Sequence, residues 1–231
     1  EAAYVPVAHA YDGAPAQLTL SEVVSALGPI LGNPSFPKCA QNVKYEWSVL
    51  RRAAQIDLRG VVCDTMLAAY LLDPGRRQFG LDELSADHLG HRMITFSDVT
   101  SAQGKDAHFS AVPLEDATAY AAEDADVTLR LWDTLQPRVV EEKLDTLARD
   151  VEIPLADVLG RMEITGVSID AERLQSQSAE FAERIEVLRG EIHTAAGREF
   201  NIDSPKQLAG ILFEELGLPA EKKTKTGFST D

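Results

Sequence analysis

The feature that most restricts the fold is a long helical pattern between positions 114 and 136, which Pro137 is expected to end. One narrow stripe of such a helix would carry Tyr120, Asp124, Val127, Leu131 and Leu135. Asp124 therefore falls on the apolar face, where an unpaired carboxylate is costly to bury, whereas Glu123 and Asp126 point away. A divalent metal ion would compensate this charge, and so would an Arg or Lys partner or a set of backbone N–H groups. Tyr120, one turn earlier, would orient a water molecule or would simply be a half-buried tyrosine.

A second polar cluster stands where a short strand is expected to run into a helix. Residues 38–41 are typical of a strand, and Asn42 is expected to be the N-cap of a helix over 43–54. Gln41 and Asn42 thus occupy the strand end at which α/β folds often bind ligands. Glu46 flanks the buried stripe of that helix. A plain N-cap and a solvated glutamate remain the alternative at this point.

The remainder of the first part alternates short strands and helices, which indicates an α/β layered domain. The expected elements are an edge strand over 4–8, a helix over 21–31 capped by Ser21, a strand over 61–63 and a helix over 65–72. Asp64 is assigned to structure, as the N-cap of the last of these helices, rather than to metal binding. Residues 75–109 are expected to be irregular.

From about residue 145 the chain is expected to be almost wholly helical. A heptad stripe predicts a long helix that ends at Gly197. Its members are Leu174, Ser178, Phe181, Ile185, Leu188, Ile192 and Ala195. We expect Phe181 and Ile185 to be buried against a neighbouring helix. Ser204 and Pro205 then begin a further helix.

The composition restricts the partners. A net charge of −15 disfavours a nucleic-acid binder that acts through its overall field, but it allows a strand held in a local groove. No apolar run approaches the roughly 20 residues of a membrane helix, and no signal peptide is recognisable at the start. Cys39 and Cys63 are expected to be small buried residues of a reducing compartment rather than a disulfide framework.

Two motifs together identify a family resemblance. Gln41-Asn42-x-Lys44-Tyr45 and the later segment 120–129, which begins Tyr-Ala-Ala-Glu-Asp, resemble the second and third exonuclease motifs of the bacterial DNA polymerases I of family A. These nucleases form the tyrosine-bearing subclass of the DEDD superfamily. Segments 3–9, 63–67 and 94–96 also fit their proofreading domain, and segments 162–170 and 200–208 resemble the start of their thumb. Exoribonucleases of the ribonuclease D type are not expected to carry that thumb signature.

The resemblance implies a fold and a function. It implies an α/β, ribonuclease H-like exonuclease domain over 1–147, with a mixed sheet and flanking helices, followed by the helical start of a thumb over 148–231. The implied function is 3′→5′ proofreading hydrolysis in an enzyme that replicates and repairs DNA. One alternative is an exonuclease-like scaffold that has lost its metal site, and a more distant one is a ribonuclease D-like exoribonuclease.

Roles for particular residues follow from the same resemblance. Tyr120, Asp124 and Glu46 would be catalytic, and Asp124 and Glu46 would bind metal. The DNA contacts would be Gln41, Asn42, Tyr45 and Phe96 for a single strand, and Lys222, Lys223 and Lys225 for duplex phosphates. Phe96 as a core aromatic and the lysines as a solvated loop are the alternatives.

Two departures from the family pattern accompany these assignments. Glu46 stands where the family usually has Asp. The family's first exonuclease motif is an Asp-x-Glu that would lie before segment 3–9, and no such motif precedes that segment in this sequence. The chain by itself is therefore expected to form an incomplete exonuclease site. Mg²⁺ is the expected ion, with Mn²⁺ or Zn²⁺ as alternatives, and the fragment would not necessarily hold one.

The resemblance also implies partners and a location. A single-stranded 3′ end and a primer–template duplex are the expected DNA partners. No membrane partner is expected, and the protein is expected to be a monomer in the bacterial cytoplasm, associated with the nucleoid.

Overall fold

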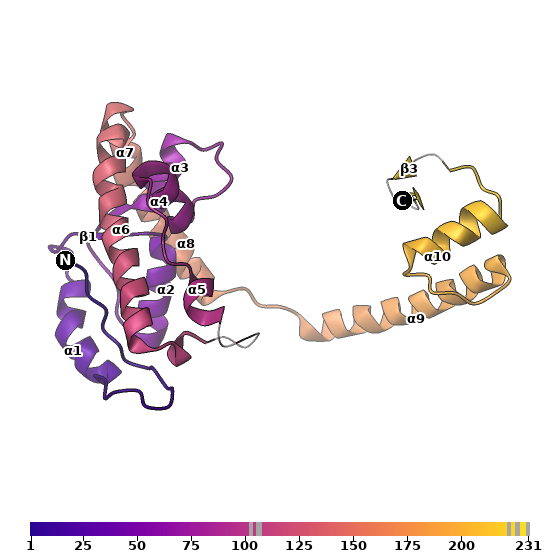
Figure 1. The fold of residues 1–231 in the computed structure, drawn as a ribbon, viewed down its shortest axis with the longest axis horizontal. Helices are drawn as coiled ribbons and strands as arrows, with labels where there is room; N and C mark the ends of the chain where they lie inside the picture. The colour runs from indigo at the N-terminus through magenta and orange to yellow at the C-terminus, as the bar shows by residue number, and fades with distance from the viewer. Residues whose placement is uncertain (102–103, 105–107, 221–222, 225–226, 230–231) are drawn as a thin grey trace. The chain divides into compact units, whose positions relative to one another are not determined.

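A computed structural model describes residues 1–101, 104, 108–220, 223–224 and 227–229, and Figure 1 shows its ribbon. The chain divides into two compact units, Glu1–Gly166 and Val167–Asp231.

The first unit combines a small sheet with many helices. In chain order its elements are α1 (Leu20–Leu31), β1 (Lys38–Ala40), α2 (Val43–Ala54), β2 (Val61–Asp64), α3 (Thr65–Leu72), α4 (Leu81–Leu89), α5 (Phe96–Thr100), the 3₁₀ turn η2 (Phe109–Ala111), α6 (Leu114–Glu141), α7 (Asp145–Leu147), the π-helical turn η3 (Ala148–Glu152) and α8 (Ile153–Thr165). Strands β1 and β2 pair in parallel, with Ala40 opposite Asp64. The expected mixed α/β fold is confirmed.

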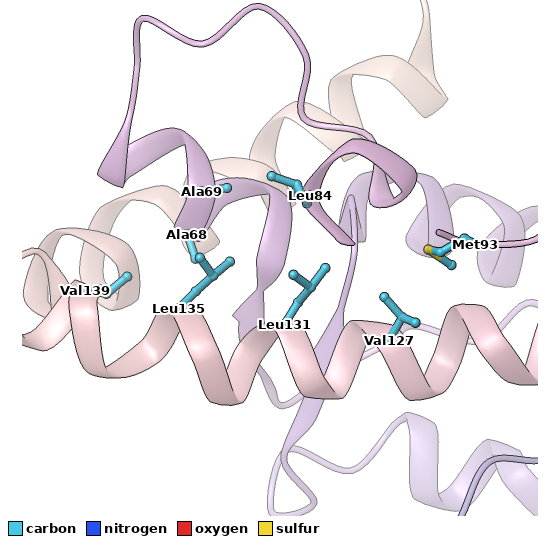
Figure 2. Close-up of a cluster of buried hydrophobic side chains, with 8 residues drawn as sticks. All are labelled: Ala68, Ala69, Leu84, Met93, Val127, Leu131, Leu135 and Val139. Atoms are coloured by element: carbon cyan, nitrogen blue, oxygen red, sulfur yellow. The ribbon is translucent and has the colours of Figure 1, made fainter. Parts of the chain in front are cut away.

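The core forms where α6 packs on α3 and α4. Val127, Leu131 and Leu135 are completely buried on α6. Figure 2 shows their side chains pointing from α6 toward Ala68, Ala69 and Leu84. Burying such side chains stabilises the fold by roughly 1.5–3 kcal/mol each. This packing fixes the rotation of α6, and it therefore also fixes where the earlier turns of the same stripe point.

Asp64 joins two helix starts to the end of β2. Its carboxylate accepts the N–H groups of Met66 and Leu67 at the start of α3, at 2.9 and 3.3 Å, so its predicted N-cap role is confirmed. It also accepts the N–H groups of Asn42 and Val43, at 3.1 and 2.8 Å. Four orphan donors of two helices thus share one buried acceptor.

Asn42 is therefore not the side-chain cap that its position suggested. It stands at the start of α2, but its side chain makes no capping bond and its backbone is left-handed, with φ 63°. Asp64, across the sheet, takes over the capping. Asparagine is one of the few residues that tolerate this backbone conformation.

Several local expectations were wrong at the edges of elements. Residues 4–8 form no strand, and the cap of α1 is Thr19, whose capping box with Glu22 replaces the expected Ser21. The segment 75–109 contains α4 and α5 rather than only irregular chain. Helix α6 continues through Pro137 to Glu141. In addition, Cys39 and Cys63, which lie opposite each other on β1 and β2, are joined in a disulfide instead of being free thiols.

The second unit is built around one long helix. Its elements are α9 (Ala171–Ala196), α10 (Pro205–Ala209), the π-helical turn η4 (Gly210–Glu215), β3 (Lys223–Thr224) and β4 (Gly227–Phe228). Asp170 caps α9, Gly197 ends it in a left-handed conformation, and Ser204 caps α10. The expected burial of the heptad stripe is wrong for this chain, because Phe181 is 63% exposed and Ile185 53%. Among the described residues, α9 has no buried residue.

The exposure of α9 gives a first prediction. Phe181→Ala in this 231-residue chain should change the free energy of unfolding by no more than about 0.5 kcal/mol, because the ring is already in water. Urea denaturation followed by circular dichroism measures this. Leu131→Ala is the matched control, and it should cost about 2–5 kcal/mol because its side chain is fully buried. A similar loss for both variants would show that α9 is covered in solution.

No helix of the described residues is long and apolar enough to cross a membrane.

Candidate active site

A cavity of about 890 Å³ opens between the end of β1, the start of α2, the start of α4 and one face of α6. The residues around it that the sequence predicted are Gln41, Asn42, Tyr45, Glu46, Tyr120 and Asp124. Two segments that are far apart in the chain therefore meet at one hollow. Asp82, Phe79 and Met66 line it as well.

Tyr120 and Asp124 form a pair one turn apart on α6. The Tyr120 hydroxyl lies within hydrogen-bonding reach of the Asp124 carboxylate. Burial raises the pKa of Asp124 to about 6, although the Tyr120 hydrogen bond opposes the shift and the charges of Asp82 and Glu123 add to it. Burial and the Asp124 charge likewise raise the pKa of Tyr120 to about 12. Tyr120 is thus a hydrogen-bond donor at neutral pH, and Asp124 is a carboxylate that a cation would stabilise.

Glu46 is the second carboxylate of the cavity whose charged form is disfavoured. Burial, and next the negative charge of Asp64, raise its pKa to about 7. Its Oε2 atom is buried without a hydrogen-bond partner. A buried carboxylate oxygen without a donor is costly, so the site favours either a proton or a positive ligand at this position.

These two carboxylates fit a divalent metal ion in kind. Hard cations such as Mg²⁺ and Mn²⁺ prefer carboxylate oxygens, and the unpartnered Glu46 oxygen is such a donor. Within the described residues, however, no three His, Cys, Asp or Glu side chains are grouped to hold an ion. Glu46 and Asp124 would therefore supply only part of a ligand set.

Gln41 and Tyr45, two other predicted residues at the cavity, differ in whether their side chains are available to a ligand. The Gln41 side chain is engaged internally: its amide donates to the Phe79 carbonyl at 2.9 Å and its oxygen accepts from the Thr65 hydroxyl. Tyr45 is 68% exposed at the cavity rim, so its ring is available to a ligand.

Phe96 lies beside the cavity rather than in its lining. It is 48% exposed, which does not fit a core aromatic. Its ring stacks on Phe109 with centroids 6.3 Å apart, and Phe109 in turn packs 5.7 Å from Tyr120. A row of three rings therefore connects Phe96 to the Tyr120–Asp124 pair.

The basic cluster is only partly described. Lys223 lies in the short strand β3, while Lys222 and Lys225 fall outside the described residues. Their role in duplex binding stays a prediction.

The sequence patterns gave no indication of three residues near the site. Asp82 lines the cavity, Phe109 packs against Tyr120, and Glu123, which is not among the residues that line the cavity, makes hydrogen bonds to His91 and Ile94. Asp82 and Phe109 lie where the sequence shows no long periodicity. A helical wheel turns Glu123 away from the stripe and says nothing about what it meets.

The chain resembles known proteins along most of its length. Residues 1–140 match a family described as 3′-5′ exonuclease, and residues 171–231 match the family described as DNA polymerase family A. The DNA polymerase I of Pseudomonas aeruginosa is 45% identical over 98% of this chain and 25% of its own length. That of Rhizobium leguminosarum is 42% identical over 98% and 23%.

A solved structure is also similar. It is the POL domain of Pol1 from M. smegmatis in complex with DNA primer-template and dNTP. It has a TM-score of 0.72 and 31% identity, and the match covers 93% of this chain and 34% of that one. The chain thus spans about a quarter of the length of the curated relatives that it matches.

Proposed function

Because this chain belongs to the 3′-5′ exonuclease family of the family A DNA polymerases, we propose that its first unit binds single-stranded DNA 3′ ends and takes part in their hydrolysis within a longer polymerase. The observation that carries this proposal is the cavity that Glu46, Tyr120 and Asp124 line together. The pKa values of two of its carboxylates, Glu46 and Asp124, are both raised. Perturbed carboxylates gathered in one hollow are typical of sites that use charge for chemistry.

Each residue has a proposed task. Asp124 and Glu46 supply negative oxygens to divalent ions, which when bound would activate water and stabilise the leaving 3′-oxygen. Tyr120 donates a hydrogen bond at the same place and positions the attacking water. Tyr45, with its exposed ring, and Asn42 line the path of the strand, and the exposed face of Phe96 stacks on a terminal base.

The wider proposals rest on the relatives. DNA synthesis and repair by the longer protein, Mg²⁺ as the ion, and contact between the lysines at 222–225 and a primer–template duplex are inferred from relatives that are bacterial DNA polymerases. A monomer in the bacterial cytoplasm, at the nucleoid, is inferred in the same way.

A second candidate is supported by one specific observation. Glu46 carries an additional methylene compared with the aspartate that the family usually has at this position, so its carboxylate stands further from the backbone. In a two-metal site the ions lie only about 3.5–4 Å apart, so the placement of each ligand is tightly limited. The unit would then be a scaffold that supports the polymerase without hydrolysing DNA.

The pH dependence of the free energy of unfolding tests whether the buried charge of Glu46 destabilises the fold. Its folded pKa of about 7 lies above the ordinary 4.5, so the folded chain binds more protons than the unfolded chain between these values. Stability should therefore fall as pH rises from about 4.5 to 7. Glu46→Gln should remove this cost, raising the free energy of unfolding at pH 8 by on the order of 1–3 kcal/mol and leaving it unchanged at pH 4.5. Asp126→Asn, an exposed carboxylate on α6, is the control.

Metal addition tests whether Glu46 and Asp124 bind an ion. If the site binds ions, millimolar Mn²⁺ or Mg²⁺ at pH 8 should raise the melting temperature of the wild-type chain, because the ion binds only the folded state. The same addition should have no effect on Glu46→Gln/Asp124→Asn. A wild-type melting temperature that does not respond to either ion would show that Glu46 and Asp124 alone do not hold an ion. The scaffold is favoured only if the longer polymerase also fails to hydrolyse single-stranded DNA with either ion.

A further inference from the structure

Glu123 directly precedes Asp124 on α6, but its carboxylate serves a different segment. Its Oε2 accepts the backbone N–H of Ile94 at 2.6 Å, and its Oε1 lies 2.8 Å from Nε2 of His91. The Glu123 side chain is 19% exposed. These bonds attach residues 91–94 to α6, and this short segment leads directly into α5 and Phe96.

The same segment has a separate attachment on its other side. The Ser85 hydroxyl of α4 donates to the His91 carbonyl at 2.9 Å, and Met93 is buried in the core. Thr95 then caps α5 through a capping box with Asp98. Residues 91–95 are thus held to α4 and the core by these contacts, and Glu123 connects them by hydrogen bonds to the helix that carries Asp124.

The segment ends in a ring with one free face. Phe96 is stacked on Phe109 on one side and 48% exposed overall. Phe109 itself is supported by His9 and Tyr4, whose ring centroids lie 5.7 and 6.3 Å away. An exposed aromatic face with a rigid backing is what a nucleobase stacks on.

We propose that Glu123 is a positioning residue that sets the place of the Phe96 ring relative to Tyr120 and Asp124. By holding residues 91–94 against α6, it keeps the ring where the terminal base of a single-stranded 3′ end would stack. This inference rests on the proposed function. The two neighbouring acids of α6 then have different roles: Asp124 lines the cavity, and Glu123 holds residues 91–94.

The side chain at 123 is suited to this task. A carboxylate offers two acceptors, and a hydrogen bond from a backbone N–H to a charged group is stronger than a neutral one. Asp126, one turn later, is a contrast: its side chain is about half exposed and lies 3.6 Å from Arg130 of the same helix. Asp126→Ala is therefore the matched control, an acid on the same helix that holds no other segment.

The first experiment needs no DNA. In the 231-residue chain, Glu123→Ala should increase hydrogen exchange of the Ile94 amide by at least about tenfold, because the amide loses a charged acceptor. Glu123→Gln should restore most of the protection, since its amide oxygen can accept the same bond. Asp126→Ala should leave the Ile94 amide unchanged. Normal protection in Glu123→Ala would overturn the positioning role.

The second experiment measures binding to a single-stranded oligonucleotide with 2-aminopurine at its 3′ end, in EDTA, by fluorescence. Phe96→Ala should weaken binding about 5- to 150-fold, the loss of one base–aromatic stack. Glu123→Ala should weaken it at least about fivefold, but by less than about twofold when Phe96 is already alanine, because both changes remove the same contact. Glu123→Gln should bind like the wild type.

The outcomes separate the two proposals. A full additional loss from Glu123→Ala in the Phe96→Ala background would show general damage, and it would overturn the positioning role. Absence of binding by the unmodified chain would overturn the proposed function, and with it the use of the ring for DNA, whatever the Ile94 amide does.

Discussion

Asp124→Asn should reduce 3′-terminal hydrolysis by the longer polymerase by at least about 10²-fold, because it removes a charged ligand of metal ions that would supply several kcal/mol of transition-state stabilisation. The amide keeps the shape of the side chain and removes the charge. Burial raises the pKa of Asp124, so the neutral amide should also be at least as stable as the carboxylate at pH 8. Loss of hydrolysis without loss of stability is therefore the expected signature.

The measurement is single-turnover degradation of a single-stranded oligonucleotide, with primer extension measured on the same preparation. Extension should be unchanged, because the substitution leaves the polymerase part of the protein untouched. Asp126→Asn, on the solvent side of α6, should retain hydrolysis. Equal losses from the two variants would contradict the placement of Asp124. A wild-type enzyme that does not hydrolyse the strand would instead establish the scaffold.

Asp64→Ala should lower the free energy of unfolding of this chain by about 3–5 kcal/mol, since it removes the single acceptor of four backbone N–H groups. The loss falls on the starts of both α2 and α3. Part of it is offset, because the Asp64 charge helps to raise the pKa of Glu46.

Urea denaturation at pH 7 measures this effect. Asp64→Asn is the informative companion, because its one amide oxygen retains some of the four bonds. It should fall between alanine and the wild type. A loss below about 1 kcal/mol for Asp64→Ala would mean that water replaces the carboxylate, and that the two helix starts are not buried as described.

The sequence correctly predicted the features that depend on short-range periodicity. The stripe of α6 correctly placed Asp124 next to the buried Val127. Gln41 and Glu46, which line the same cavity, were assigned to the site by the family resemblance and not by the local pattern. The α/β class followed from the alternation of elements. In these regions the local preference and the tertiary packing agree.

Most of the errors concern local structure that is determined by a residue far away in the sequence. Asn42 looks like a cap, but Asp64 supplies the acceptor from the neighbouring strand, and no local pattern contains that contact. Helices α4 and α5 are too short to show a periodicity. Glu123 meets His91 and Ile94 across a loop whose path the sequence does not specify.

The heptad stripe of α9 shows the opposite limit. Its spacing correctly describes an amphipathic helix, but spacing cannot say whether a partner is present. Phe181 and Ile185 remain exposed in the described chain.

The cavity acids and Asp64 would respond differently to relaxed selection. Glu46 and Asp124 are held at raised pKa values, so their neutral replacements would be tolerated or favoured by folding alone. Asp64 has four backbone donors, and losing it would endanger the fold. In a lineage that no longer needs hydrolysis, neutral drift would therefore remove the catalytic acids early and preserve Asp64. The fold would then be retained after the hydrolytic activity is lost. The presence of Asp64 would therefore carry no information about whether the nuclease is active.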